Sequence, residues 1–132
     1  MNGNQTEYMA IAAKQDVDLF LDRTNGLHDG YILSVQYVHR GHSGGNPHWI
    51  DPALSELKVR IMVTSIRDAV VELVFEGIVK WQIYDDSTEI LDTAISFTED
   101  GNVIWADDTS TDPAVREQGS YVIAAAMKWR FV

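Results

Sequence analysis

Histidine and aspartate stand side by side at His28-Asp29, between Gly26 and Gly30, and this pair is the first candidate for chemistry in the chain. Together the two side chains could work as an acid–base couple. Neighbouring residues of a strand point to opposite faces, so both can serve one site only if the strand has not yet begun at Asp29. In the structural interpretation, which we favour, Asp29 accepts backbone N–H bonds at a helix-to-strand junction and His28 packs partly buried.

Three further histidines, His39, His42 and His48, fall within ten residues, with Asp51 close behind. Imidazole and carboxylate groups bind divalent metals when a fold holds them in fixed positions. The Gly- and Pro-rich segment that carries them favours an exposed loop over a metal site. Trp49 of the same segment is a binding candidate, either as an exposed contact anchor or, as we expect, folded back over the sheet.

Acidic residues are concentrated in the region 85–117. It contains ten of the twenty Asp and Glu residues and one base, in a chain with a formal charge of −10. The binding candidates in it are Asp85, Asp86, Asp107 and Asp108. Such a region forms either solvated turns or a docking surface for a basic partner. The negative charge argues against nucleic acid as a partner, because phosphate binding needs clustered Lys and Arg. The spacing of a calcium-binding EF-hand loop is absent.

Motifs for covalent or cofactor chemistry are missing from the sequence. The chain has no cysteine, which excludes thiol nucleophiles, disulfides and thiolate zinc sites. Serine and threonine occur without a Gly-x-Ser-x-Gly elbow, and we expect no cofactor. The first residues lack the basic stretch and apolar run of a signal peptide, and no apolar run is long enough to cross a membrane. These features favour a non-enzymatic, cytoplasmic protein.

The elements that must position these residues form one predicted domain over residues 1–132. A frayed start is expected within residues 1–14, with residues 8–13 as either a short strand or the first turns of a helix. One amphipathic helix is predicted over residues 15–24, with Asp16 as its cap and Asn25-Gly26 as its stop. Six strands are predicted from alternating hydrophobicity, over residues 28–39, 57–63, 70–84, 89–98, 103–106 and 120–132. Short connections, among them Asp100-Gly101, favour antiparallel pairing.

The longest predicted strand, residues 70–84, has apolar odd positions and mostly polar even positions, so one face should be core and the other wet. We expect Gly77 to bend or bulge it. Glu72 and Glu76 should form cross-strand ion pairs with Lys58 and Arg60. Tryptophans 81, 105 and 129 are expected in the core. The pattern predicts an α+β fold, mostly β: an antiparallel meander of about six strands, as a strongly bent sheet, a small sandwich or an incomplete barrel.

Several segments together resemble a family of small, mostly bacterial proteins of unknown function marked by a Phe-His-Asp-Ser-like motif. They are LHDGYI, VELVFEGIVKW, EILDTAISF, NVIWADD and SYVIAAAMKWR, within residues 16–130. In the motif, Leu27 stands in place of Phe and Gly30 in place of Ser. Proteins with similar motifs include immunity proteins of bacterial toxin systems, which implies a toxin as the partner.

Three functions are therefore expected from the sequence. The first is a binding protein, such as an immunity protein, whose acidic surface over residues 85–117 docks a basic partner. The second is a small-molecule binder or hydrolase with a cleft near His28, Asp29 and Trp49. The third is a homodimeric module, formed by pairing of edge strands or by stacking of sheet faces. No membrane partner is expected.

Overall fold

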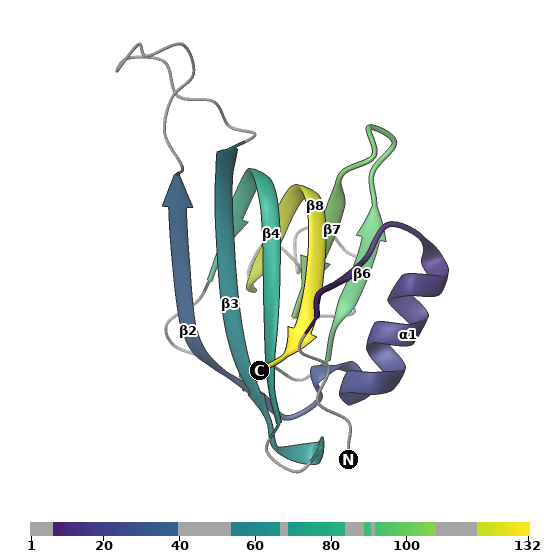
Figure 1. Ribbon diagram of the computed structural model, residues 1–132, viewed down its shortest axis with the longest axis vertical. Helices are drawn as coiled ribbons and strands as arrows, with labels where there is room; N and C mark the ends of the chain where they lie inside the picture. Colours follow the sequence, from purple (N-terminus) through teal and green to yellow (C-terminus); the bar gives the residue numbers. More distant parts are fainter. Residues whose placement is uncertain (1–6, 40–53, 67–68, 84–88, 91, 108–118) are drawn as a thin grey trace.

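The computed structural model describes residues 7–39, 54–66, 69–83, 89–90, 92–107 and 119–132. Antiparallel strands dominate it and one helix accompanies them, which confirms the predicted α+β, mostly β class (Figure 1). The elements are β1 (Met9–Ala10), α1 (Lys14–Thr24), the 3-10 turn η1 (Asn25–Leu27), β2 (Gly30–His39), β3 (Ser55–Val63), the 3-10 turn η4 (Thr64–Ile66), β4 (Ala69–Gln82), β5 (Glu89–Ile90), β6 (Ala94–Phe97), β7 (Val103–Ala106) and β8 (Tyr121–Phe131).

Helix α1 begins and ends through local hydrogen bonds. Asp16 is the third helical residue and not the predicted N-cap; its Oδ2 accepts the backbone N–H groups of Ala12 and Ala13, at 2.9 and 3.0 Å, and so satisfies donors that the helix cannot. Asn25 ends the helix as predicted, in a left-handed conformation with φ of 53°. No helix of the described ranges is long and apolar enough to cross a membrane.

Two antiparallel meanders make up the sheet, β2–β3–β4 and β6–β7–β8, and they meet where β4 pairs with β8. The full order is β5-β2-β3-β4-β8-β7-β6, and β1 pairs with the end of β8 beyond β7. The last strand therefore lies inside the sheet, as predicted. Since the described strands belong to a single sheet, the strongly bent sheet, and not the sandwich, is the alternative that the chain adopts.

The sheet is bent so strongly that its two ends approach each other. The segment expected to form one strand over residues 89–98 is divided into β5, which pairs with β2 at one edge, and β6, which pairs with β7 at the other. Asp92 and Thr93 lie between the two strands, and the Asp92 side chain accepts the N–H of Thr93 at 2.9 Å. Residues 91–93 span at most ~14 Å, whereas the edges of a flat seven-stranded sheet lie ~29 Å apart.

The core occupies the inner side of this bend, where α1 covers it. Phe20 of α1 packs edge to face on Trp129 of β8, with ring centroids 5.2 Å apart. Trp105 is fully buried against Phe75, which confirms the core role predicted for Trp105 and Trp129. The main members of the core are Phe20, Leu27, Leu57, Val59, Ile61, Val63, Val71, Leu73, Phe75, Trp105, Val122, Met127 and Trp129.

Strand β4 bends at Gly77, as predicted. Gly77 has φ of +68°, the pairing with β8 shifts register just beyond it, and a Cβ built there would lie 2.8 Å from the Cβ of Ala125. The bend changes which positions are buried. In β8, Val122 and Ala124 are buried where the opposite parity was predicted, and Trp81 is 38% exposed and stacked on Tyr37 rather than in the core.

Replacing Gly77 by alanine should destabilise the protein by about 3 kcal/mol, because left-handed backbone strain adds to the contact with Ala125. Gly101→Ala is the matched control: its φ is +86°, but nothing lies within 4 Å of the new methyl group, so it should cost only the strain of about 1–2 kcal/mol. Ala125→Gly in the Gly77→Ala background should recover the difference. Urea denaturation measures all three, and equal losses for the two glycine variants would contradict the close approach.

Candidate functional site

The pair His28-Asp29 lies in a turn before the strand, so the two side chains do face each other. His28 Nε2 is 3.6 Å from Asp29 Oδ2, with the side chains 56% and 51% exposed. The expectation of a partly buried His28 is therefore wrong. Strand β2 begins only at Gly30, which removes the alternation that would have separated the pair.

This turn is held by its backbone. Leu27 and Asp29 have φ of 58° and 60°, and Leu27 is fully buried, which is rare for a bulky residue in this conformation. The hydroxyl of Ser65 donates to the carbonyl of His28 at 3.1 Å, and that of Thr64 donates to the carbonyl of Asp29 at 3.3 Å. The backbone carbonyls, rather than the Asp29 carboxylate, thus fasten the junction to η4, and the motif residues have a clear structural role.

The other predicted site residues are only partly described. Trp49, Asp85, Asp86, Asp108, His42 and His48, like the loop predicted over residues 40–53, lie outside the described residues. His39 is the last residue of β2 and pairs with Ser55. Asp107 binds back to the chain, because its Oδ1 accepts the N–H of Ser120 at 3.1 Å. Within the described ranges, no group of three His, Asp or Glu residues is placed to hold a metal ion.

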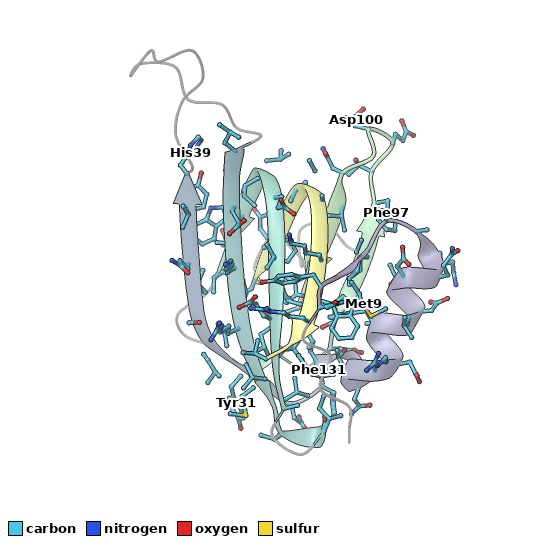
Figure 2. The ribbon with its side chains drawn as sticks, viewed as in Figure 1. Met9, Tyr31, His39, Phe97, Asp100 and Phe131 are labelled. Carbon is cyan, nitrogen blue, oxygen red and sulfur yellow. The ribbon has the colours of Figure 1, made fainter. Side chains whose placement is uncertain are left out.

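Apart from Glu89, which lies in β5, the described acidic residues of the region 85–117 lie at the two ends of the β6–β7 hairpin. Glu99 and Asp100 occupy its turn and are exposed, and Figure 2 shows Asp100 at the outer tip. The turn has the predicted form: Gly101 donates its N–H to the carbonyl of Thr98 at 3.0 Å. Asp92 and Asp107 stand at the other end, where β6 starts and β7 stops. The fold therefore separates the acidic residues into two groups.

A small apolar groove lies beside this hairpin. It has a volume of about 150 Å³ and forms where β7 and β1 take successive parts of the same edge of β8. Gly101 of the acidic turn and the 39%-exposed Phe97 border it. Its lining is Ala10, Ile11, Ala12, Phe97, Gly101, Val103, Ala125, Ala126 and Met127. The groove places small apolar residues next to exposed carboxylates.

A buried carboxylate, Glu72 of β4, lies at the centre of the outer sheet face. Its side chain is 1% exposed, its Oε2 accepts the Nε–H of Arg60 of β3 at 2.9 Å, and its Oε1 accepts that of Arg130 of β8 at 3.1 Å. The hydroxyl of Tyr8 donates to Oε1 as well. The Tyr8 ring also contacts the guanidinium of Arg130, 4.5 Å from its centroid, and the ammonium of Lys128, at 4.7 Å.

These contacts set the ionisation of the group. Burial alone raises the pKa of Glu72, but the hydrogen bonds from Tyr8 and Arg60 and the charges of Arg130 and Arg60 outweigh it and lower the pKa below 4.5. Burial, followed by the hydrogen bond to Glu72, raises the pKa of Tyr8 to about 12. A carboxylate that is ionised and fully bonded is a poor general base. Tyr8, Arg60, Glu72 and Arg130 therefore form a lock, by which we mean a set of contacts that holds the N-terminal segment against the outer face of the sheet.

The sequence predicted this lock only in part. The ion pair of Glu72 with Arg60 is confirmed, but Glu76 pairs with Lys128 of β8, at 3.3 Å, because Lys58 stands opposite Val74. The outer face was expected to be wet, yet Val74 is 1% exposed. Tyr8 and Arg130 were not predicted members of this contact, because residues 8–13 were expected only as a short strand or the first turns of a helix, and the pairing of β4 with β8 does not follow from the sequence pattern.

Glu72→Gln should lower the free energy of unfolding by about 3 kcal/mol. This value is at the low end of the cost of breaking a buried ion pair, because both arginines keep contact with water. Glu76→Gln, whose side chain is 46% exposed, is the control and should cost less than about 1 kcal/mol. Because the folded pKa of Glu72 is depressed, its contribution is complete above pH 4.5 and is lost as the pH falls through the folded pKa. Urea titrations from pH 7 to pH 3 should show a shallower acid decline in Glu72→Gln; a decline equal to that of the wild type would refute the assignment.

Tyr8→Phe should lower the free energy of unfolding by about 2 kcal/mol, the value of a hydrogen bond to a charged group. The raised pKa of Tyr8 means that this stabilisation is complete below pH 10 and is lost as the pH rises towards about 12. Thermal melts between pH 8 and pH 12 should therefore bring the wild type and Tyr8→Phe together at the alkaline end. Tyr31→Phe, at an exposed tyrosine of β2, should follow the wild type throughout, and a constant gap for Tyr8→Phe would contradict the proposed hydrogen bond.

Comparisons with known proteins identify no family for this chain: no family model, curated protein or solved structure matches it. Its function is therefore argued from its own residues. The arrangements that bear on it are the exposed His28-Asp29 turn, the locked outer face, and the acidic hairpin with its apolar groove.

Proposed function

We propose that the chain is a non-enzymatic binding protein that docks a basic partner at the β6–β7 hairpin and the groove beside it. The observation that carries this proposal is the apolar groove bordered by the turn that presents Glu99 and Asp100. Lysine and arginine bury their aliphatic stems along apolar surfaces and keep the charged head outside. A stem in the groove and a head at the two carboxylates would satisfy both parts of such a side chain.

The distribution of charge also favours docking of a basic partner at the end of the molecule that carries the β6–β7 hairpin. The outer sheet face carries four bases, Lys58, Arg60, Lys128 and Arg130, against the acids Glu56, Glu72 and Glu76, which pair with them. The bases of this face outnumber its acids by one, so the acidic excess of the described residues lies outside it. Helix α1, on the same side of the molecule as β6 (Figure 1), adds the exposed Asp18 and Asp22. This asymmetry attracts and orients a basic partner.

The likeness of the LHDG motif, residues 27–30, to the motifs of some toxin-immunity proteins extends the proposal to a basic toxin as the partner. The docking surface is narrower than the whole acidic region 85–117, since Asp92 and Asp107 stand at the far end of the hairpin. The alternative of a hydrolase at His28 and Asp29 has less support. That pair is more than half exposed, and neither residue lines the groove.

Charge reversal at the hairpin turn is the direct test. Glu99→Lys combined with Asp100→Lys should weaken binding to the basic product of an adjacent gene about tenfold at low salt. The difference from the wild type should shrink as salt is raised, because exposed charges are screened. Titration calorimetry at about 50 and about 300 mM salt measures both effects. These concentrations lie below and above the ionic strength at which the Debye length is ~8 Å, so screening of the exposed charges differs between them.

A second variant separates the groove from the charges. Ala12→Leu places a larger side chain in the groove and should weaken binding equally at both salt concentrations. Asp22→Lys on α1 changes the charge outside the hairpin and serves as the control, with a loss of less than about threefold expected for one rim charge. A partner that is not basic, or binding that the hairpin variant leaves intact, would overturn the proposal.

A further inference from the structure

Strand β2 forms a sheet edge that is covered only at its start. Along the edge away from β3, its Gly30 and Tyr31 pair with β5, and no other described strand pairs with this edge. Its inner side pairs with β3 through to His39. From residue 32 to residue 39, the backbone N–H and C=O groups that point away from β3 therefore have no described strand beside them.

This edge lacks the features that usually protect one. Its sequence, GYILSVQYVH, contains no Asp, Glu, Lys, Arg or Pro. Natural edge strands are blunted by charges, prolines, bulges or short length. The bulge of β2 lies between Ile32 and Ser34, next to the part that β5 covers. Leu33, within the bulge, is 53% exposed, and beyond it Val35, Tyr37 and Val38 are 37%, 45% and 36% exposed.

We propose that a second copy of the chain pairs with this edge, β2 to β2, in an antiparallel register centred on Val35. The register is self-complementary. Val35 meets its own counterpart, Leu33 meets Tyr37 and Ser34 meets Gln36, so apolar residues oppose apolar residues and polar residues oppose polar ones. A two-fold symmetric interface requires this kind of match of a surface with itself.

The inner face of the sheet continues across such a pair. Val35 and Tyr37 stand opposite the buried Val59 and Leu57 and therefore share their face, but they lie at its exposed margin. Tyr37 is already stacked on Trp81, with ring centroids 5.8 Å apart. Leu33 of the second copy would cover the open side of Tyr37, so the interface adds apolar burial to the backbone hydrogen bonds.

The distribution of charge favours association of two copies through this edge rather than through the rest of the surface. Two copies with a net charge of −10 each repel one another, and β2 is a long strand without a charged residue. The acidic hairpin belongs to the opposite end of the strand order. Figure 2 shows His39 of β2 and Asp100 of the hairpin on opposite sides of the molecule. Pairing along the half of β2 that ends at His39 therefore adds the second copy on the side of the molecule away from the hairpin turn.

Charge at the symmetry axis tests the register. Sedimentation equilibrium from about 5 µM to about 1 mM covers the range expected for an interface smaller than ~800 Å² per partner, and the wild type should shift from monomer to dimer. Val35→Lys and Val35→Glu should each stay monomeric, because like charges would stand ~5 Å apart. An equimolar mixture of the two should dimerise again. Leu19→Lys, on α1 at 40% exposure, should associate like the wild type.

A cysteine variant checks the same contact without adding charge. The chain has no native cysteine, so Val35→Cys introduces the only thiol, and directly opposed residues in an antiparallel pair lie within disulfide range. Mild oxidation should give a covalent dimer, seen on a non-reducing gel, whereas Leu19→Cys should not. A wild type that stays monomeric at about 1 mM, a mixture that fails to associate, or equal cross-linking of the two cysteine variants would each overturn the proposal.

Discussion

The charged contact at Glu72 fixes how the two halves of this sheet meet. Strands β4 and β8 join the two meanders, and Glu72 lies between them with Arg130 on one side and Arg60 on the other. An apolar trio could also be stable at this position, but it would specify the register less strictly. A slip of one residue would turn the carboxylate into the core, away from both arginines, at a large cost in desolvation. Tyr8 adds the N-terminal segment to the same contact.

Local patterns in the sequence predicted much of the fold, whereas features that depend on strand order were missed. Asn25 as the helix stop, Gly77 as the bend and the Asp100-Gly101 hairpin each follow from the conformational preferences of a few neighbouring residues. The division of residues 89–98 depends on which strands lie at the two edges. The exposure of Trp81 depends likewise on the bend that carries it past β3 to Tyr37. Alternation shows that a strand has two faces, but not what covers each one.

The same distinction holds for the candidate site. The sequence predicted an acidic surface over the region 85–117 and a turn at Asp100-Gly101, because turns are polar for local reasons, but its named acidic candidates did not include Glu99 or Asp100. It did not predict the groove, whose lining comes from three segments around residues 10–12, 97–103 and 125–127. For the His28-Asp29 pair, the structural interpretation was favoured but its details were wrong: the backbone carbonyls, through Ser65 and Thr64, hold the turn, and not the Asp29 carboxylate or a buried His28.

The centre of the outer sheet face and the two edges of the sheet have different roles. The outer face at β3, β4 and β8 has its charges paired, so it offers little to a partner. Both proposed binding surfaces, at β2 and at the β6–β7 hairpin, lie instead towards the edges of the sheet. A dimer through β2 would point two acidic hairpins away from each other. Such a dimer binds a partner that carries two basic sites more tightly than one copy can, because the second contact forms at a high effective concentration. For a partner with one basic site, the same dimer leaves the affinity of each hairpin unchanged, so dimerisation would then serve stability by covering the β2 edge.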